Sequence, residues 1–182
     1  MKTLTLSFNF FKKNIYLFVF FLSYLSLFYS FYQNEDGTGR GASGDFEATY
    51  GFILALKNNL LANPKEFTLV HTPLHFIILS LLDNLFESTN SLRLFYCGLT
   101  ILLPLFFYLS LNHDQSINGN QLSNNKKNFL LLSSIIFIFP AFRYTSIWAA
   151  DLITSLIFFQ ISIFFYLKWL KNKTKYIDNN IL

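Results

Sequence analysis

Residues 15–32 read IYLFVFFLSYLSLFYSFY, an apolar run without a charged side chain. An α-helix rises about 1.5 Å per residue, so about 20 such residues cross the roughly 30 Å hydrocarbon core of a bilayer. Lys12 and Lys13 precede the run, as basic residues also do in a signal peptide. The run is long, however, and ends in Tyr-Ser-Phe-Tyr-Gln rather than in the small residues of a cleavage site. The sequence therefore predicts an uncleaved first membrane-spanning helix.

The composition of the whole chain favours the same class of protein. The 182 residues are 53% hydrophobic and only 13% charged, and the mean hydropathy is +0.39. Soluble domains carry about 25% charged residues, so a water-soluble domain is excluded. The formal net charge of +4 comes from short lysine clusters beside apolar runs, which indicates membrane orientation rather than nucleic-acid binding. The single cysteine, Cys97, lies in an apolar run and is expected to be an inert buried thiol.

Lysine positions fix the number of spans. Besides the first, three apolar runs are long enough to cross, namely 93–112, 128–143 and 148–170. The run at 72–82 is too short and favours an interfacial helix. With four spans, the lysines near both termini and at 126–127 all face the cytoplasm, whereas a fifth span at 72–86 would turn the last two clusters outward. Since only an even number of spans keeps all lysine clusters on the cytoplasmic side, the sequence predicts four spans with both termini cytoplasmic.

The polar segment 33–92 is expected to form a large first outer loop. Apolar residues from Phe46 to Leu61 recur on one helical face, and Asn63-Pro64 ends that pattern. This helix and a second one at 72–86 are expected to lie on the outer membrane surface. Glycines indicate a flexible turn over Asp36–Asp45.

The predicted fold is thus all-α and integral to the cell (inner) membrane, with about four transmembrane helices and two interfacial helices. Composition and charge pattern indicate the lipid bilayer as the partner of this protein, and no nucleic acid is expected. The expected order along the chain is a cytoplasmic tail (1–14), a span (15–32), the outer loop (33–92, with helices 46–61 and 72–86), a span (93–112), a cytoplasmic loop (113–127), two spans (128–143 and 148–170) and a cytoplasmic tail (171–182).

Two acidic residues stand at the start of the first interfacial helix. Asp45 directly precedes it, and Glu47 falls in its first turn. One interpretation is structural, because Asp is a favoured helix N-cap and an acid in the first turn favours the helix dipole. The other is catalytic, because burial at a membrane boundary can raise the pKa of a carboxylate towards that of a useful general base.

His71 and His75 have the spacing of two metal ligands on one helical face. Pro73 between them fits only the first turn of a helix. The free N–H groups of that turn would then point at an anion such as a phosphate headgroup. Two alternatives stay open: a zinc site, for which no third ligand stands nearby, and histidines without a function. The sequence leaves a divalent-metal requirement open, because it holds no clear set of ligands.

These elements resemble the N-terminal part of the GT-C superfamily of membrane glycosyltransferases, which includes protein O-mannosyltransferases and aminoarabinose transferases. Its members have a first span, an outer loop with Asp and then Tyr, and surface helices of which the second opens with His-Pro-Pro-Leu. Asp45 and Tyr50 match the first element, and residues 71–74 match the second except at Thr72. Arg93 opens the next span, and residues 139–144, FPAFRY, match a second outer loop with a basic group.

The resemblance implies transfer of a sugar from a polyprenyl-phosphate donor to an acceptor on the outer face, with inversion at the anomeric carbon. Because the family's Asp-Glu pair is Asp45-Phe46-Glu47 here, either carboxylate would be the catalytic base. The implied substrate-binding residues are Tyr50, His71, His75, Arg143 and Asp151.

Asp151 stands at the outer end of the last span, where a charge is costly unless it is paired or solvated. Arg143, eight residues earlier, is its expected partner. The alternative for Asp151 is an interfacial residue that reaches water without a function.

The chain departs from the family in length, since members carry about twice as many spans or more. It is therefore expected to be a truncated product or a half-module whose C-terminal half is encoded separately. The alternative function is non-catalytic: a small polytopic membrane protein, either a transporter fragment or an assembly subunit. A transporter would place ionisable residues at mid-bilayer, whereas the charges here stand at span ends or in the loop.

Overall fold

The computed structural model describes residues 2–36, 41–59, 73–114 and 122–181. Every regular element in this part of the chain is an α-helix, so the all-helical prediction is confirmed. The helices are α1 (Lys2–Tyr32), α2 (Gly41–Asn59), α3 (Pro73–Asp83), α4 (Thr89–Leu99), α5 (Leu102–Asp114), α6 (Leu122–Ile136), α7 (Pro140–Ile147) and α8 (Asp151–Ile181).

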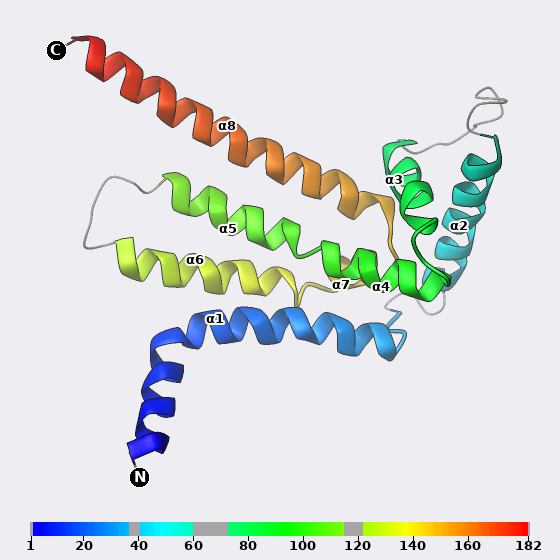
Figure 1. Ribbon diagram of the computed structural model, residues 1–182, viewed down its shortest axis with the longest axis horizontal. Coiled ribbons are helices and arrows are strands. Elements are labelled where there is room, and N and C mark those ends of the chain that lie inside the picture. Colours follow the sequence, from blue (N-terminus) through cyan, green and yellow to red (C-terminus); the bar gives the residue numbers. More distant parts are fainter. Residues whose placement is uncertain (1, 37–40, 60–72, 115–121, 182) are drawn as a thin grey trace.

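Four long segments lie side by side in a layer (Figure 1). α1 packs on α6, α6 on α5, and α5 on α8. We call the end where α1 begins and α8 ends the terminal end. At the opposite end, the loop end, α2 and α3 cross the direction of the bundle (Figure 1). α7 lies next to α4 and also packs on α1 and α8. This arrangement gathers three separate parts of the sequence at the loop end.

Three described helical segments are long and apolar enough to cross a membrane: Asn14–Tyr32, Thr89–His113 and Asp151–Lys173. The second joins α4 and α5 across a break at Thr100 and Ile101. A fourth crossing arises if Asn125–Ile136 and Pro140–Ile147 form one broken span. Length and composition therefore support three to four spans, while the interfacial position of α2 and α3 stays a prediction.

The run at 128–143, which the sequence presents as one span, is broken. Between α6 and α7 the chain bends by 63°. Pro140 opens α7 and has no N–H for a continuing helix, and Phe139 before it adopts the extended conformation that a following proline imposes. The bend turns α7 away from the direction of α6 and towards the other elements of the loop end.

The expected tails and turns are also more helical than predicted. α1 begins at Lys2 and kinks at Asn14, and α8 continues beyond residue 170 to Ile181. α2 begins at Gly41, so the flexible turn expected over Asp36–Asp45 is wrong for residues 41–45. Glycine has a low intrinsic helix propensity, so the glycines before Asp45 predicted a turn where α2 in fact begins.

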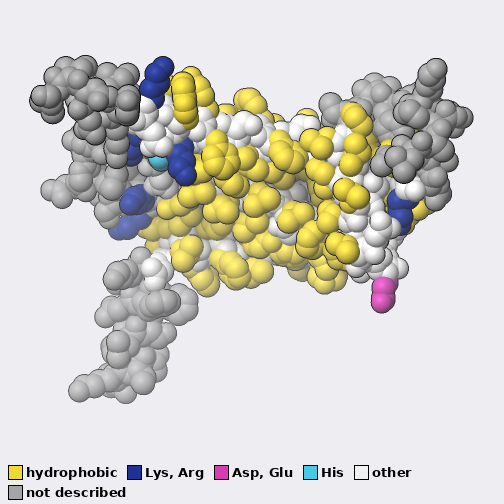
Figure 2. Space-filling model, turned by 45° about the horizontal axis from the view of Figure 1, so that its top comes forward, with side chains coloured by type: hydrophobic (Ala, Val, Ile, Leu, Met, Phe, Trp, Pro, Cys, Tyr) yellow, Lys and Arg dark blue, Asp and Glu magenta, His cyan; other side chains and the backbone are white. Residues whose placement is uncertain are grey.

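The surface of the bundle suits a lipid environment. In the 18-residue apolar stretch of each candidate span, at most 28% of the residues are buried. Large apolar side chains such as Phe21, Leu132 and Phe159 are exposed. Figure 2 shows these apolar side chains as a continuous band between the two ends, with lysines gathered at the terminal end. Because lipid tails are as apolar as leucine, burial drives helix association weakly here, and polar contacts between helices gain importance.

Cysteine accessibility tests the topology. Glu87 is exposed at the loop end and Lys127 near the start of α6 at the terminal end, whereas the native Cys97 is buried. With both termini cytoplasmic, we expect a membrane-impermeant maleimide on intact cells to label the Glu87→Cys variant and not the Lys127→Cys variant. The unsubstituted protein is the control. Labelling of the Lys127→Cys variant instead of the Glu87→Cys variant would contradict four crossings and indicate a fifth at 72–86, and labelling of both would contradict a crossing between residues 87 and 127.

Candidate functional site

Asp45 and Tyr144 meet at the loop end, although 99 residues separate them. The hydroxyl of Tyr144, on α7, donates a hydrogen bond of 2.7 Å to Oδ2 of Asp45, on α2. Asp45 is exposed and lies in the second turn of α2, not at its N-cap, so the capping interpretation is wrong. The contact brings the first polar segment of the sequence against the segment that follows the third apolar run.

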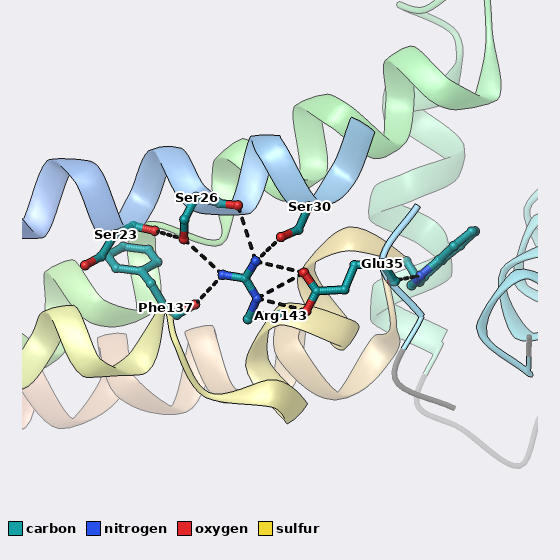
Figure 3. A network of polar contacts seen from close by, with 7 residues as sticks. Ser23, Ser26, Ser30, Glu35, Phe137 and Arg143 are labelled. Carbon is teal, nitrogen blue, oxygen red and sulfur yellow. Dashed lines mark hydrogen bonds and ion pairs between the residues drawn. The ribbon is translucent and has the colours of Figure 1, made fainter. Parts of the chain in front are cut away.

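Arg143 fastens α7 to the end of α1 (Figure 3). Its Nε and NH2 donate to the carboxylate of Glu35 at 3.0 and 2.8 Å, and NH2 also donates to Ser30 Oγ. NH1 donates to Ser26 Oγ at 2.9 Å and to the carbonyl oxygen of Phe137 at 3.2 Å. All three guanidinium nitrogens are therefore used in this network, and the ion-pair partner is Glu35 rather than the expected Asp151.

Glu35 is a site residue that the sequence interpretation missed. Partial burial raises its pKa, but hydrogen bonds from Ser30 and Arg143 and the charge of Arg143 outweigh burial. The pKa of this carboxyl therefore lies below its ordinary value. Its backbone carbonyl accepts a hydrogen bond of 2.9 Å from the indole of Trp148, the C-cap residue of α7, which joins the end of α7 to the same network. Glu35 is the first acid after the first span, a signal that could have marked it.

The remaining acidic and aromatic candidates of the first loop lie along α2. Glu47 is exposed and, two residues after Asp45, projects from a different side of the helix. Tyr50 stacks on Phe46 with ring centroids 6.2 Å apart. Partial burial and the nearby carboxylate of Asp83 raise the pKa of Tyr50. Asp83 in turn pairs with Lys57 at 2.6 Å, which fastens α3 to α2.

His75 is buried between α3, α4 and α8 rather than facing a surface. Its Nδ1 lies 2.8 Å from the hydroxyl of Thr154, which is 2.6 Å from the hydroxyl of Tyr96. Burial lowers the pKa of His75 to about 4, and the negative charge of Asp151 offsets only part of this. The imidazole is therefore neutral at pH 7. His71 lies outside the described residues.

An apolar cavity of about 490 Å³ lies on another side of α7, between α5, α6 and α8. Leu103, Ile135 and Leu156 are among its lining residues, and Gln160 adds a polar group. α7 contributes Ala141, Phe142 and Thr145 to the lining, so the same short helix borders this cavity and carries Tyr144.

Among the described residues, no group of three His, Cys, Asp or Glu side chains could hold a metal ion. Comparison with protein-family models, with curated proteins and with solved structures gives no match. The GT-C resemblance therefore stays an expectation drawn from motifs and their order.

A double-mutant cycle tests the network around Arg143. We expect Arg143→Gln and Glu35→Gln to destabilise the protein non-additively, with a coupling free energy of about 0.5–3 kcal/mol, because the two side chains contact each other directly. Thermal or denaturant unfolding in detergent measures it. Arg143→Gln combined with Glu87→Gln, an exposed acid of the same end, is the control and should be additive.

The neutral state of His75 predicts a pH dependence of stability. Between its pKa of about 4 in the folded state and the ordinary 6.5, the unfolded chain binds a proton that the folded protein does not. The free energy of unfolding should therefore fall as the pH falls from 6.5 to 4, by up to about 1.4 kcal/mol per pH unit from this group. His75→Gln should weaken the pH dependence of the free energy of unfolding in this range. An unchanged slope would show that other groups cause it.

Proposed function

We propose that this chain is a polyprenyl-phosphate-dependent glycosyltransferase, or part of one, with its reaction centre at the loop end. The single observation that carries the proposal is the hydrogen bond between Tyr144 and Asp45. The resemblance assigns Asp45 to the first outer loop and Tyr144 to the second, and in a catalytic centre these two loops would have to meet.

Asp45 suits the role of general base in this proposal. Tyr144 donates to one oxygen of the carboxylate and holds its orientation, and the second oxygen would take the proton of an acceptor hydroxyl. The deprotonated oxygen attacks the anomeric carbon, the bond from that carbon to the phosphate oxygen breaks, and polyprenyl phosphate leaves. Attack opposite the leaving group inverts the anomeric configuration.

The donor would approach from the bilayer. A polyprenyl chain is apolar, and the cavity between α5, α6 and α8 offers apolar walls at the depth of the candidate spans. α7, which borders this cavity, also carries Tyr144. The lysines at the terminal end favour a cytoplasmic position for that end, which would place the loop end, and the transfer, on the outer face.

One observation favours the non-catalytic alternative. Arg143, the implied ligand of the leaving phosphate, already has its charge matched by Glu35 and its nitrogens engaged by Ser26 and Ser30. A guanidinium held in this way stabilises a fold without binding a substrate. As an assembly subunit, the protein would use this network only to hold its helices together.

Asp45→Asn separates the two functions. Asparagine still accepts the hydrogen bond from Tyr144 but cannot take a proton, so we expect sugar transfer to fall by roughly 10²–10⁴-fold while stability changes little. The measurement is release of polyprenyl phosphate from a panel of polyprenyl-phosphate sugars by membranes that contain the protein.

Glu47→Gln is the matched control, because it removes an exposed carboxylate from the same helix. Near-normal turnover in Asp45→Asn with loss in Glu47→Gln would move the role of base to Glu47. Absence of transfer with every donor of the panel would favour the assembly subunit.

A further inference from the structure

Arg93 is a second arginine at the loop end, and it is enclosed. Only 5% of the residue is exposed, in the first turns of α4. Its guanidinium carbon lies 3.8 Å from the ring centroid of Trp148 and 5.0 and 5.1 Å from those of Phe31 and Phe46. Aromatic faces attract a cation, but they carry no full negative charge to neutralise it.

The polar contacts of Arg93 are fewer and weaker than those of Arg143. Nε donates to the carbonyl oxygen of Ile147 and NH1 to Oδ1 of Asn90, both at 3.3 Å and both to neutral acceptors. NH2 is buried without a hydrogen-bond partner among the described residues, and no described carboxylate forms an ion pair with Arg93. A buried cation in this state calls for an anion.

A cavity of about 240 Å³ lies beside this arginine, between the end of α1 and the start of α4. Arg93 itself does not line the cavity, but two residues of its wall contact the guanidinium: Phe31 lies against its face, and Asn90 accepts a hydrogen bond from NH1. The full lining is Phe31, Tyr32, Asn34, Asn90, Ser91 and Leu94.

The wall of the cavity supplies hydrogen-bond donors. Asn34 and Asn90 carry side-chain amides, and Ser91 carries a hydroxyl that lies 2.9 Å from the hydroxyl of Ser88. Asn90 and Ser91 belong to the first turn of α4, whose N-cap is Ser88. The N-terminus of a helix has a partial positive charge and favours an anion. The helix end and the enclosed guanidinium therefore favour the same kind of ligand.

We propose that this cavity binds a phosphate oxyanion, with Arg93 as its counter-charge. An oxygen of the ligand takes the place of Asn90 Oδ1 on NH1 and satisfies NH2, while the freed Asn90 amide and Ser91 donate to the other oxygens. The phosphate belongs either to an anionic lipid headgroup or to a soluble phosphate. The site uses neither Asp45 nor Tyr144 and does not depend on the proposed sugar transfer.

Ligand-induced stabilisation tests the site. In one arm, the thermal midpoint of the full chain in neutral detergent is followed against inorganic phosphate, with chloride keeping the ionic strength constant. In the other, the chain is compared in nanodiscs of phosphatidylcholine with and without phosphatidylglycerol. A saturable rise is expected in one arm or both, because a ligand that binds only the folded state raises its stability. A rise with phosphate identifies a soluble ligand, and a rise with phosphatidylglycerol alone identifies a lipid headgroup.

Asn90→Asp is the decisive variant, because it places a carboxylate where the NH1 acceptor now lies and leaves every core residue intact. We expect its midpoint to be higher than that of the unchanged protein without ligand, and its response to phosphate or phosphatidylglycerol to be lost. Lys57→Gln removes a positive charge from the same end, away from the cavity, and should keep the full response. An unchanged protein that responds in neither arm, or an Asn90→Asp variant that responds fully, would overturn the site.

Discussion

The ion pair between Arg143 and Glu35 is the contact on which the loop end depends. α7 has only eight residues and bends away from α6 by 63°, and a helix of that length does not persist alone. Arg143 fixes it to the end of α1 through the carboxylate of Glu35, two serine hydroxyls and the backbone carbonyl of Ser26. The positions of Tyr144 against Asp45 and of Trp148 against the Glu35 carbonyl follow from that attachment.

The two described arginines of the loop end differ in how their positive charge is compensated. Arg143 is partly exposed and has a carboxylate partner, so its charge is matched within the chain. Arg93 is almost fully enclosed and meets aromatic faces and neutral oxygens. A structural ion pair accounts for the first arrangement, whereas the second leaves a charge for something outside the described chain to match. Trp148 contacts both systems, through its indole N–H and its ring face.

Sequence patterns were sufficient for the apolar spans and insufficient for the contacts that join them. Span length follows from local composition, so the first, second and last candidate spans could be predicted from apolar runs of the sequence. The start of α2 at Gly41 could not, because local propensity opposes a helix there. Glu35 was missed since its partner lies 108 residues away. Arg93 was recognised only as the start of the second span, because nothing local reveals three aromatic rings around it.

The break before Pro140 has a consequence for how the protein is made. It frees the carbonyl of Phe137, which a continuous helix would bind within its own ladder, and Arg143 uses that oxygen together with groups of α1. A ribosome completes Ser26, Ser30 and Glu35 more than a hundred residues before Arg143. The groups that receive the arginine are therefore synthesised first, and α7 reaches its place by docking on a helix that the ribosome has already completed.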